Sequence, residues 1–531
     1  MWFSRYTLTA TALLSQLCLA STVDHVQAKP PCSCSDLHLP PLLGTEILSF
    51  QNAEKQAFTI NPVPLLLPTA AKVPPICEVN ITLTHPGTND TVGIQVWLPL
   101  KNWNGRFLAL GGSAWAAGLG PLTLGPAVEG GFAAVSTDAG LSGNLSSPDA
   151  WALKDNGDVN LGLLTNFASR SVYEATILGK SLSRQFYGKE FRTYWNGCST
   201  GGRQGLVAAQ QYPELFDGIL AGAPAIYWPT YLLAELWPQV VFREENYYPK
   251  PEELGAVVAA AVAACDGLDG VIDGVIDEPS ECQFEPASAI GTLDFNGKNV
   301  TITAQVARIL QQIWTGPVVN GQQLWYGSLI GAPLWDLGAT VEANGSRFGV
   351  PFFVADTWTR FLLQQNASFP TSALDSEDLG ELFLKSQTQY DSLFNSANPD
   401  LSKLQETGGK LIVWHGKADQ LIFTQGSTQY RRQVEEAFGG GANVDEFFRF
   451  FLAPGVDHCG LGETFGARPD PNGLLGALIS WVENGTVPTF VEGQTPPNAP
   501  LNFTRKICSF PTVSSYRGSG DVNVAESYDC I

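Results

Sequence analysis

The chain has 531 residues, of which 44% are apolar and 15% charged, and its net charge at pH 7 is −21. This length allows two or three domains, or one large domain with an insertion, and the apolar content supports a sizeable core. The excess of Asp and Glu, 51 against 30 Lys and Arg, argues against nucleic acid as a partner, because a polyanion requires a basic surface.

The N-terminus has the pattern of a secretory signal peptide. Arg5 is followed by an apolar segment, Thr7 to Ala20, that ends in small residues. We therefore expect a signal peptide over residues 1–20, with cleavage after Ala28 as the alternative, and a secreted, extracellular protein. A buried N-terminal helix is the competing interpretation. No later run of 18 apolar residues exists, so we expect no membrane anchor.

Export agrees with the sequons and the cysteines. Eight N-x-[ST] sequons predict glycosylated surface loops: Asn80, Asn89, Asn144, Asn299, Asn344, Asn366, Asn484 and Asn502. The cysteines beyond the signal segment, Cys508 and Cys530 among them, are expected to form disulfides rather than metal sites. Cys77 could pair with either Cys32 or Cys34.

Along the chain, alternating residues at 79–99 predict a hairpin, and short apolar strands are expected at 106–113 and 131–140. Apolar spacing predicts a helix over 165–187. Residues 191–225 then give a strand, a tight turn, a helix and a second strand. Strands that alternate with helices indicate a parallel sheet with crossover helices.

The pattern is irregular from about 226 to 405, where Trp, Pro and short helical pieces are frequent. One helix is expected there at 254–265. Strand character returns at 410–422 and 445–460, on either side of a helix at 429–438. The predicted organisation is a core in two parts, 21–225 and 406–531, interrupted by a lid domain over 226–405.

Gly197-Cys198-Ser199-Thr200-Gly201 fits the G-x-S-x-G pattern between a predicted strand and a predicted helix. At such a turn the serine backbone is strained and its hydroxyl is exposed above the sheet, as in α/β-hydrolases. We therefore predict Ser199 as a nucleophile and an α/β-hydrolase core with a large inserted lid domain. The alternative is a glycine-rich turn with a capping serine.

A nucleophilic serine needs a base and an acid that orients it, in the chain order Ser, Asp or Glu, His. Of the five histidines, His458 alone follows a late strand with room for an acid before it. Asp419, after the strand that contains LIVW, is the favoured acid. Asp457 is the competitor, although a residue adjacent to His458 usually points away from the imidazole. His415 is interpreted as a loop residue with local hydrogen bonds.

Cys198 precedes Ser199, and Cys459 follows His458. A disulfide between these cysteines would bring their Cα atoms within about 4.4–6.8 Å and hold nucleophile and base together. Two unrelated buried thiols are the alternative. For the oxyanion hole we expect the backbone N–H of Thr200 and one from the glycine turn 111–113, for which we choose Gly112.

The segment CDGLDGVIDGVIDEPSEC (265–282) places four aspartates among glycines between two cysteines. Such a group of carboxylates suits Ca²⁺, which binds 6–8 oxygen ligands. The alternative is a solvated acidic turn closed by a Cys265–Cys282 disulfide. Zinc is not expected, because the loop has no histidine.

The chain resembles the tannase and feruloyl esterase family of secreted fungal serine esterases. The resemblance is carried by GCSTGGRQG (197–205), HGKADQLI (415–422), DHCG (457–460), CDGLDGVIDGVI (265–276) and the C-terminal segment from Ile507 to Cys530. It implies a triad of Ser199, Asp419 and His458 with a Cys198–Cys459 disulfide. It also implies a structural Ca²⁺ in the lid, bound by Asp266, Asp269 and Asp273 and by the backbone oxygens of Val271 and Val275.

The resemblance predicts two-step hydrolysis of phenolic acid esters without an organic cofactor, most plausibly feruloyl esters of plant cell-wall polysaccharide. Lid tryptophans could bury the phenolic ring, namely Trp228, Trp237, Trp325, Trp335 and Trp358. A tannase that cleaves galloyl esters is the alternative, and a non-catalytic secreted binding glycoprotein is the remote one. A homodimer is possible.

Overall fold

The computed structural model describes residues 32–531 except 463, 465 and 498. The expected signal peptide lies outside the described residues. Within the described part of the chain, no helix is both long and apolar enough to cross a membrane.

A nine-stranded sheet forms the centre of the molecule, in the order β1-β4-β5-β7-β6-β8-β9-β16-β17. The strands β7, β6, β8, β9, β16 and β17 run parallel, and β5, β4 and β1 extend the sheet with antiparallel pairing. Their bounds are β1 Glu46–Lys55, β4 Ile76–Thr84, β5 Val92–Pro99, β6 Arg106–Leu110, β7 Ala133–Thr137, β8 Arg192–Cys198, β9 Gly218–Gly222, β16 Lys410–Gly416 and β17 Phe448–Ala453.

Helices cover both faces of this sheet. One face packs against α3 (Ser171–Tyr187), α4 (Thr200–Gln211) and α12 (Thr424–Ala437), and the other against α1 (Pro121–Glu129) and α14 (Pro471–Asn484). Each face buries its own cluster of aliphatic and aromatic side chains, so the core has three layers. A three-stranded sheet of β18 (Arg468–Pro469), β19 (Phe490–Gln494) and β20 (Thr504–Cys508) follows near the C-terminus.

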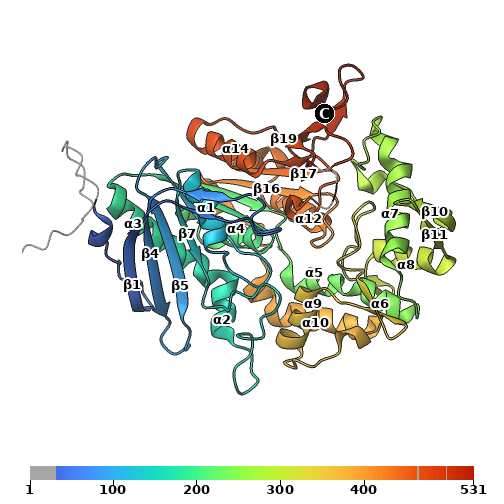
Figure 1. Ribbon diagram of the computed structural model, residues 1–531, viewed down its shortest axis with the longest axis horizontal. Helices are drawn as coiled ribbons and strands as arrows, with labels where there is room; N and C mark the ends of the chain where they lie inside the picture. The colour runs from blue at the N-terminus through green and yellow to red at the C-terminus, as the bar shows by residue number, and fades with distance from the viewer. Residues whose placement is uncertain (1–31, 463, 465, 498) are drawn as a thin grey trace, which may run out of the picture.

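The segment between β9 and β16 contributes no strand to the nine-stranded sheet, and Figure 1 shows it to one side of the sheet. We call this segment the lid. Its helices are α5 Trp228–Glu235, α6 Trp237–Glu244, α7 Pro251–Cys265, α8 Ala304–Thr315, α9 Phe353–Thr357, α10 Ser376–Phe394 and α11 Ser402–Glu406. Three short hairpins connect them: β10 Gly291–Phe295 with β11 Lys298–Ile302, β12 Val318–Val319 with β13 Gln322–Gln323, and β14 Thr340–Ala343 with β15 Ser346–Gly349.

The predicted core strands and crossover helices are present, but their details differ from expectation. The helix expected over 165–187 is α2 (Leu161–Thr165), a π-helical turn at Asn166–Arg170 and then α3. Strand β1 was not expected, because its residues are mostly exposed and show no apolar alternation. Four smaller strands flank the core as two hairpins, β2 (Phe58–Ile60) with β3 (Ala71–Val73), and β21 (Ser514–Tyr516) with β22 (Tyr528–Cys530).

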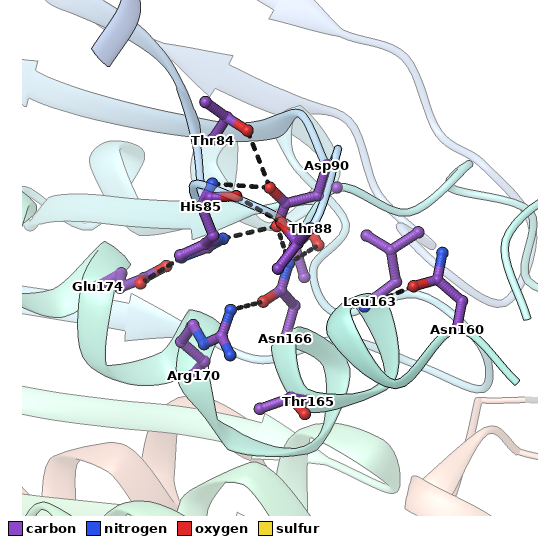
Figure 2. Close-up of polar contacts among 12 residues, drawn as sticks. Thr84, His85, Thr88, Asp90, Asn160, Leu163, Thr165, Asn166, Arg170 and Glu174 are labelled. Carbon is purple, nitrogen blue, oxygen red and sulfur yellow. Dashed lines mark hydrogen bonds and ion pairs between the residues drawn. The ribbon is translucent and has the colours of Figure 1, made fainter. Parts of the chain in front are cut away.

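A buried polar cluster joins the β4–β5 hairpin to the helix that follows β7 (Figure 2). His85 lies between two carboxylates, with Nδ1 at 2.6 Å from Asp90 Oδ2 and Nε2 at 2.7 Å from Glu174 Oε1. Asn166 Nδ2 donates to the same Asp90 oxygen (2.7 Å). The cluster therefore fixes the start of the π-helical turn, and His85 is committed to this structural role.

Arg203, on α4, connects that turn to the segment after Ser199. Its two terminal nitrogens donate to the carbonyl oxygens of Phe167 and Ala168 at 3.0 and 2.9 Å. The guanidinium is fully buried and lies over the rings of Phe167, Trp228 and Phe394. Because Trp228 and Phe394 belong to lid helices, this one side chain ties helix α4, the π-helical turn and the lid together.

Four disulfides join described cysteines: Cys34–Cys77, Cys198–Cys459, Cys265–Cys282 and Cys508–Cys530. The first decides the choice that the sequence left open, because Cys77 pairs with Cys34. The third closes the acidic loop.

Candidate active site

A cavity of about 500 Å³ lies at the carboxyl ends of the parallel strands, between the core and the lid. Ser199 and His458 both line it, together with Gly112, Thr200 and Gln420. Most of its wall is apolar, with side chains from lid helices α5 and α9. A largely apolar cavity with a few polar groups is the usual form of a small-molecule site.

Ser199 stands at the junction of β8 and α4. Its φ of 61° and ψ of −122° lie in a region that residues with a side chain rarely adopt, so this backbone is strained. The strain is held by hydrogen bonds on both sides: Ser199 N donates to Gly222 O (3.0 Å), and Arg203 N donates to Ser199 O (3.0 Å). The structure therefore forms the sharp strand-to-helix turn that the sequence predicted.

The glycines of the motif allow the chain to turn this tightly. A Cβ on Gly197 would lie 2.6 Å from backbone atoms of Gly201. On the opposite wall, a Cβ on Gly112 would lie 1.9 Å from the carbonyl oxygen of Ala116. Neither position tolerates a side chain, because the obstacle in each case is backbone.

The disulfide Cys198–Cys459 connects the two halves of the site across 261 residues of sequence, with the Cα atoms 6.0 Å apart. Cys459 has a left-handed backbone, with φ 56°. Cys198 is adjacent in sequence to Ser199, and Cys459 is adjacent to His458. The disulfide therefore limits how far Ser199 and His458 can separate.

Asp419 and His458 form a buried pair. Asp419 Oδ2 lies 2.8 Å from His458 Nδ1, and Asp419 Oδ1 accepts the backbone N–H groups of Leu421 (2.9 Å) and Ile422 (2.8 Å). The competing acid, Asp457, makes a different contact and accepts from the backbone N–H of Gly462 (3.3 Å). The geometry therefore favours Asp419 as the residue that orients the imidazole.

The charges of this pair stabilise each other. Burial acts to lower the pKa of His458, but the charge of Asp419 and its hydrogen bond outweigh burial and raise that pKa above its ordinary value. Burial acts to raise the pKa of Asp419, yet His458 and His415 hold it far below its usual range. Asp419 is thus ionised at neutral pH, and His458 binds a proton more readily than a free histidine.

His415 has a larger part than the local loop contact that we expected. It is fully buried near the end of strand β16, and its Nε2 lies 2.9 Å from the same Asp419 oxygen that faces His458. Its Nδ1 is 2.8 Å from Ser427 Oγ on α12. The four-residue spacing of His415 and Asp419 was the available signal in the sequence. A strand would not bring two such residues together, but β16 ends at Gly416 and the chain then turns back toward His415.

Gln420 is a second residue that sequence reasoning missed. Its Oε1 accepts the backbone N–H of His458 (3.0 Å), and its Nε2 donates to Asp336 of the lid (3.3 Å). Among the described contacts there is no Ser199–His458 hydrogen bond, and His458 Nε2 lies 3.7 Å from Cys459 Sγ. Proton transfer therefore requires the pair to tighten when substrate binds, as is common in free enzymes.

The structure argues against Gly112 as an oxyanion donor. Its N–H donates to Gln204 Oε1 (2.9 Å), and the neighbouring N–H of Ser113 donates to Ala116 O (3.0 Å). Of the turn 111–114, only Ala114 has an N–H without an acceptor in the described part of the chain. Thr200, the other expected donor, lines the cavity at the start of α4.

The five tryptophans that we considered for the acyl pocket have different positions. Trp228 lines the cavity, and no other member of the set does. Trp358 is fully buried inside the lid, where its Nε1 donates to Ser386 Oγ (3.0 Å). It therefore belongs to the hydrophobic core of the lid.

The acidic loop lies in the lid, directly after α7. Asp266 accepts the backbone N–H groups of Asp273 (3.0 Å) and Gly274 (3.0 Å), and Asp269 accepts that of Val271 (3.0 Å). Asp273 forms an ion pair with Arg505. Among the residues that the structure describes, no three acidic, histidine or cysteine side chains are positioned to hold a metal.

The chemistry of the loop nevertheless suits a hard cation. Asp266 and Asp273 are only 7% and 8% exposed, and four aspartates share this turn with one guanidinium, that of Arg505. The excess negative charge and the oxygen-only ligands fit Ca²⁺.

The amino-acid sequence matches the family described as "Tannase and feruloyl esterase" over residues 77–531. The chain belongs to this family. It is accordingly a carboxylic ester hydrolase, and the cavity that contains Ser199 and His458 is its candidate active site.

Individual proteins agree with the family match. A protein from Arthroderma benhamiae named probable feruloyl esterase is 42% identical over 531 residues, which is 98% of each chain. The structure of tannin acyl hydrolase from Aspergillus niger superposes with a TM-score of 0.82 and 26% identity over 93% of each chain. Feruloyl esterase B from Aspergillus oryzae, with a TM-score of 0.74 and 24% identity, covers 93% of this chain and 98% of its own and shares the fold.

The disulfide at the site can be tested by a double substitution, Cys198→Ala with Cys459→Ala. We expect kcat/KM on a chromogenic ester to fall about 100-fold, because small misplacements of reacting groups have effects of that size. Closure of so long a loop also predicts a loss of up to about 5 kcal/mol of stability. Urea denaturation and steady-state kinetics at a temperature where the variant is folded measure both effects.

The matched control is Cys508→Ala with Cys530→Ala. It removes a bridge between residues 22 positions apart in the sequence, and neither cysteine lines the cavity. It should cost about 3 kcal/mol of stability and leave kcat/KM unchanged. Equal kcat/KM in the two double variants would show that the bridge next to Ser199 has no role in positioning.

The substitution Asp419→Asn tests the acid–base pair. We expect kcat to fall by about 10⁴-fold, because an amide stabilises the wrong imidazole tautomer. The acid limb of the kcat/KM pH profile should also move to lower pH, because the carboxylate that raises the pKa of His458 is gone.

Asp457→Asn is the control for that change, since it removes a charge beside His458 without touching Nδ1. It should alter kcat less than about tenfold, an effect of ordinary charge perturbation. A larger loss for Asp457→Asn than for Asp419→Asn would reverse the assignment of the acid.

Proposed function

We propose that the protein hydrolyses esters of phenolic acids, with Ser199 as nucleophile, His458 as general base and acid, and Asp419 as the residue that orients the imidazole. The observation that carries this proposal is the buried Asp419–His458 pair at 2.8 Å beside a strained, cavity-facing serine. The family match and the disulfide between the two adjacent cysteines support it.

The first half of the reaction forms an acyl-enzyme. The Ser199 oxygen attacks the ester carbonyl while His458 Nε2 takes its proton, and the resulting imidazolium donates through Nδ1 to Asp419. His458 then gives that proton to the alcohol oxygen as the bond between this oxygen and the acyl carbon breaks. Water repeats the sequence in the second half, and the free acid leaves.

The negative charge that develops on the carbonyl oxygen needs backbone donors. The N–H of Thr200 follows the nucleophile directly and is one donor that we propose. For the second we propose Ala114 in place of Gly112, because the Gly112 N–H is held by Gln204. The Thr200 hydroxyl donates to the Ala114 carbonyl (2.8 Å), so the two segments are joined at this point.

Feruloyl esters are the substrate that we favour within this class. The support is the 42% identity over nearly the whole chain to a protein named probable feruloyl esterase. Galloyl esters are the second candidate, favoured by the TM-score of 0.82 to a tannin acyl hydrolase. Both have a flat phenolic acyl group that suits the apolar cavity with Trp228 in its wall.

We further propose that the protein is secreted and glycosylated, and that its natural substrate is esterified plant cell-wall polysaccharide. The N-terminal pattern and the eight sequons support export. The net charge of −21 suits a neutral polymer better than a polyanionic one. A homodimer is a separate proposal, and we assign no interface to it.

We propose in addition that the lid binds a structural Ca²⁺ ion through Asp266, Asp269 and Asp273 and the backbone oxygens of Val271 and Val275. The ion would supply positive charge that holds this loop closed, and it has no part in the hydrolysis. The support is the excess of aspartates over cations in a partly buried turn.

The substrate is tested by comparing kcat/KM for methyl ferulate and methyl gallate. We expect hydrolysis of methyl ferulate to exceed that of methyl gallate, and Ser199→Ala to abolish both by at least about 10⁴-fold. A purified protein that cleaves neither ester would overturn the proposed function. A preference for methyl gallate would assign the second candidate.

Calcium binding is tested by thermal unfolding in EGTA and in excess Ca²⁺. Ca²⁺ at about 100 times its Kd should stabilise the fold by about 2.7 kcal/mol, and Asp269→Asn should remove this gain. Asp294→Asn, an exposed aspartate on the β10–β11 hairpin, is the matched control and should keep it. Identical unfolding curves in EGTA and Ca²⁺ would refute the site.

A further inference from the structure

Glu235, the last residue of α5, is a carboxyl group in the wall of the catalytic cavity. The residue is 1% exposed, and its Oε2 has no hydrogen-bond partner in the described part of the chain. Buried polar atoms are nearly always hydrogen-bonded in folded proteins. An oxygen without a partner beside the candidate nucleophile's cavity therefore calls for an explanation in terms of a ligand.

The fold itself gives Glu235 no compensation. Its neighbours on the helix that also line the cavity are Trp228, Tyr231 and Leu232. Among the described residues, the charges that act on it are those of Asp419 and Asp336, both negative. Burial, together with the charges of Asp419 and Asp336, raises the pKa of Glu235 well above its ordinary value. Burial therefore favours the protonated carboxylic acid, which has one O–H donor and one carbonyl acceptor.

Two other polar side chains in the cavity wall, Gln420 and Asp336, contact each other. Gln420 uses its carbonyl oxygen for the backbone N–H of His458 and its amide for Asp336. Gln420 and Asp336 are therefore part of the contact that positions the loop carrying His458. Glu235 is left as the carboxyl that can exchange hydrogen bonds with a bound molecule.

The position of Glu235 indicates which part of the substrate it meets. Among the residues that line the cavity, Leu65 (62% exposed), Phe353 (38%) and Leu461 (36%) reach solvent, whereas Glu235 is buried. We infer from this that the cavity opens on the side of the exposed residues. The alcohol half of a polymeric ester has to continue out of the cavity. The enclosed part of the cavity must then receive the acyl group, which ends in its aromatic ring.

We propose that Glu235 determines specificity for the acyl group by exchanging hydrogen bonds with a phenolic hydroxyl on its ring. The inference rests on the proposed function, since it assigns a partner to one end of the same substrate. A neutral carboxyl matches this partner: its O–H donates to the phenolic oxygen, or its carbonyl accepts the phenolic proton. The chemical class selected is the hydroxylated aromatic acids over their unsubstituted analogues.

The test compares two substrates that differ by one hydroxyl, methyl p-coumarate and methyl cinnamate, on the intact protein. For Glu235→Leu we expect kcat/KM on methyl p-coumarate to fall about 10- to 100-fold, as for a lost hydrogen bond, with kcat/KM on methyl cinnamate changed less than about threefold. Glu235→Gln, which keeps a donor and an acceptor at this position, should retain most of the preference. Thermal unfolding should show Glu235→Leu at least as stable as the unsubstituted protein, because an unpaired buried carboxyl is lost.

Glu381→Leu is the matched control, the same change on the exposed side of lid helix α10, and should leave both substrates unaffected. Glu235→Met replaces the leucine variant should that one not fold. The assignment would be overturned if Glu235→Leu left the ratio of kcat/KM for methyl p-coumarate to that for methyl cinnamate unchanged, which includes an equal loss on both. It would also be overturned if the variant changed only the preference for the alcohol group of the ester. If the unsubstituted protein hydrolyses neither ester, the proposed function fails instead.

Discussion

The covalent link between Cys198 and Cys459 is the constraint on which the site depends. It joins the end of strand β8 to the loop after β17, two places separated by 261 residues and by the whole lid. Each half of the site is locally strained, with Ser199 and Cys459 both at positive φ. Strained backbone persists only where its surroundings hold it, and here the bridge and the hydrogen bonds of the Ser199 turn do so. The bridge therefore links nucleophile and base directly, without the lid as an intermediary.

A second set of contacts fixes helix α4, which begins directly after Ser199. The His85 cluster fixes the π-helical turn through Asn166, and the carbonyl groups of that turn bind Arg203 four residues after Ser199. Arg203 lies in turn against aromatic rings from the core and the lid. Two of the three guanidinium nitrogens of Arg203 are hydrogen-bonded, whereas Nε has no partner in the described part of the chain. Buried charges of this kind add little net stability but can specify one arrangement. The polar interior behind the site is thus a means of positioning.

Two carboxyl groups at the site have pKa values shifted in opposite directions because their surroundings differ. Asp419 accepts hydrogen bonds from two histidines and two backbone N–H groups, and it is ionised. In the described part of the chain Glu235 has no such donors, and burial raises its pKa well above the ordinary value. The same chemical group can therefore orient a base at one end of the cavity and, as we propose, recognise a neutral phenol at the other.

Local patterns in the sequence predicted the α/β core and the place of the strained serine turn, through the alternation of strands with helices and the glycines around Ser199. The pairing of Cys198 with Cys459 was implied by the family resemblance, and the cysteines beside Ser199 and His458 made it a reasonable expectation. The sequence also selected Asp419 and His458, since late strands of a parallel sheet end at one edge. Which N–H groups are free could not be predicted locally, because Gly112 is held by a glutamine 92 residues away. The contact of His415 with Asp419 and the lack of a partner for Glu235 among the described residues also depend on packing between segments far apart in the chain.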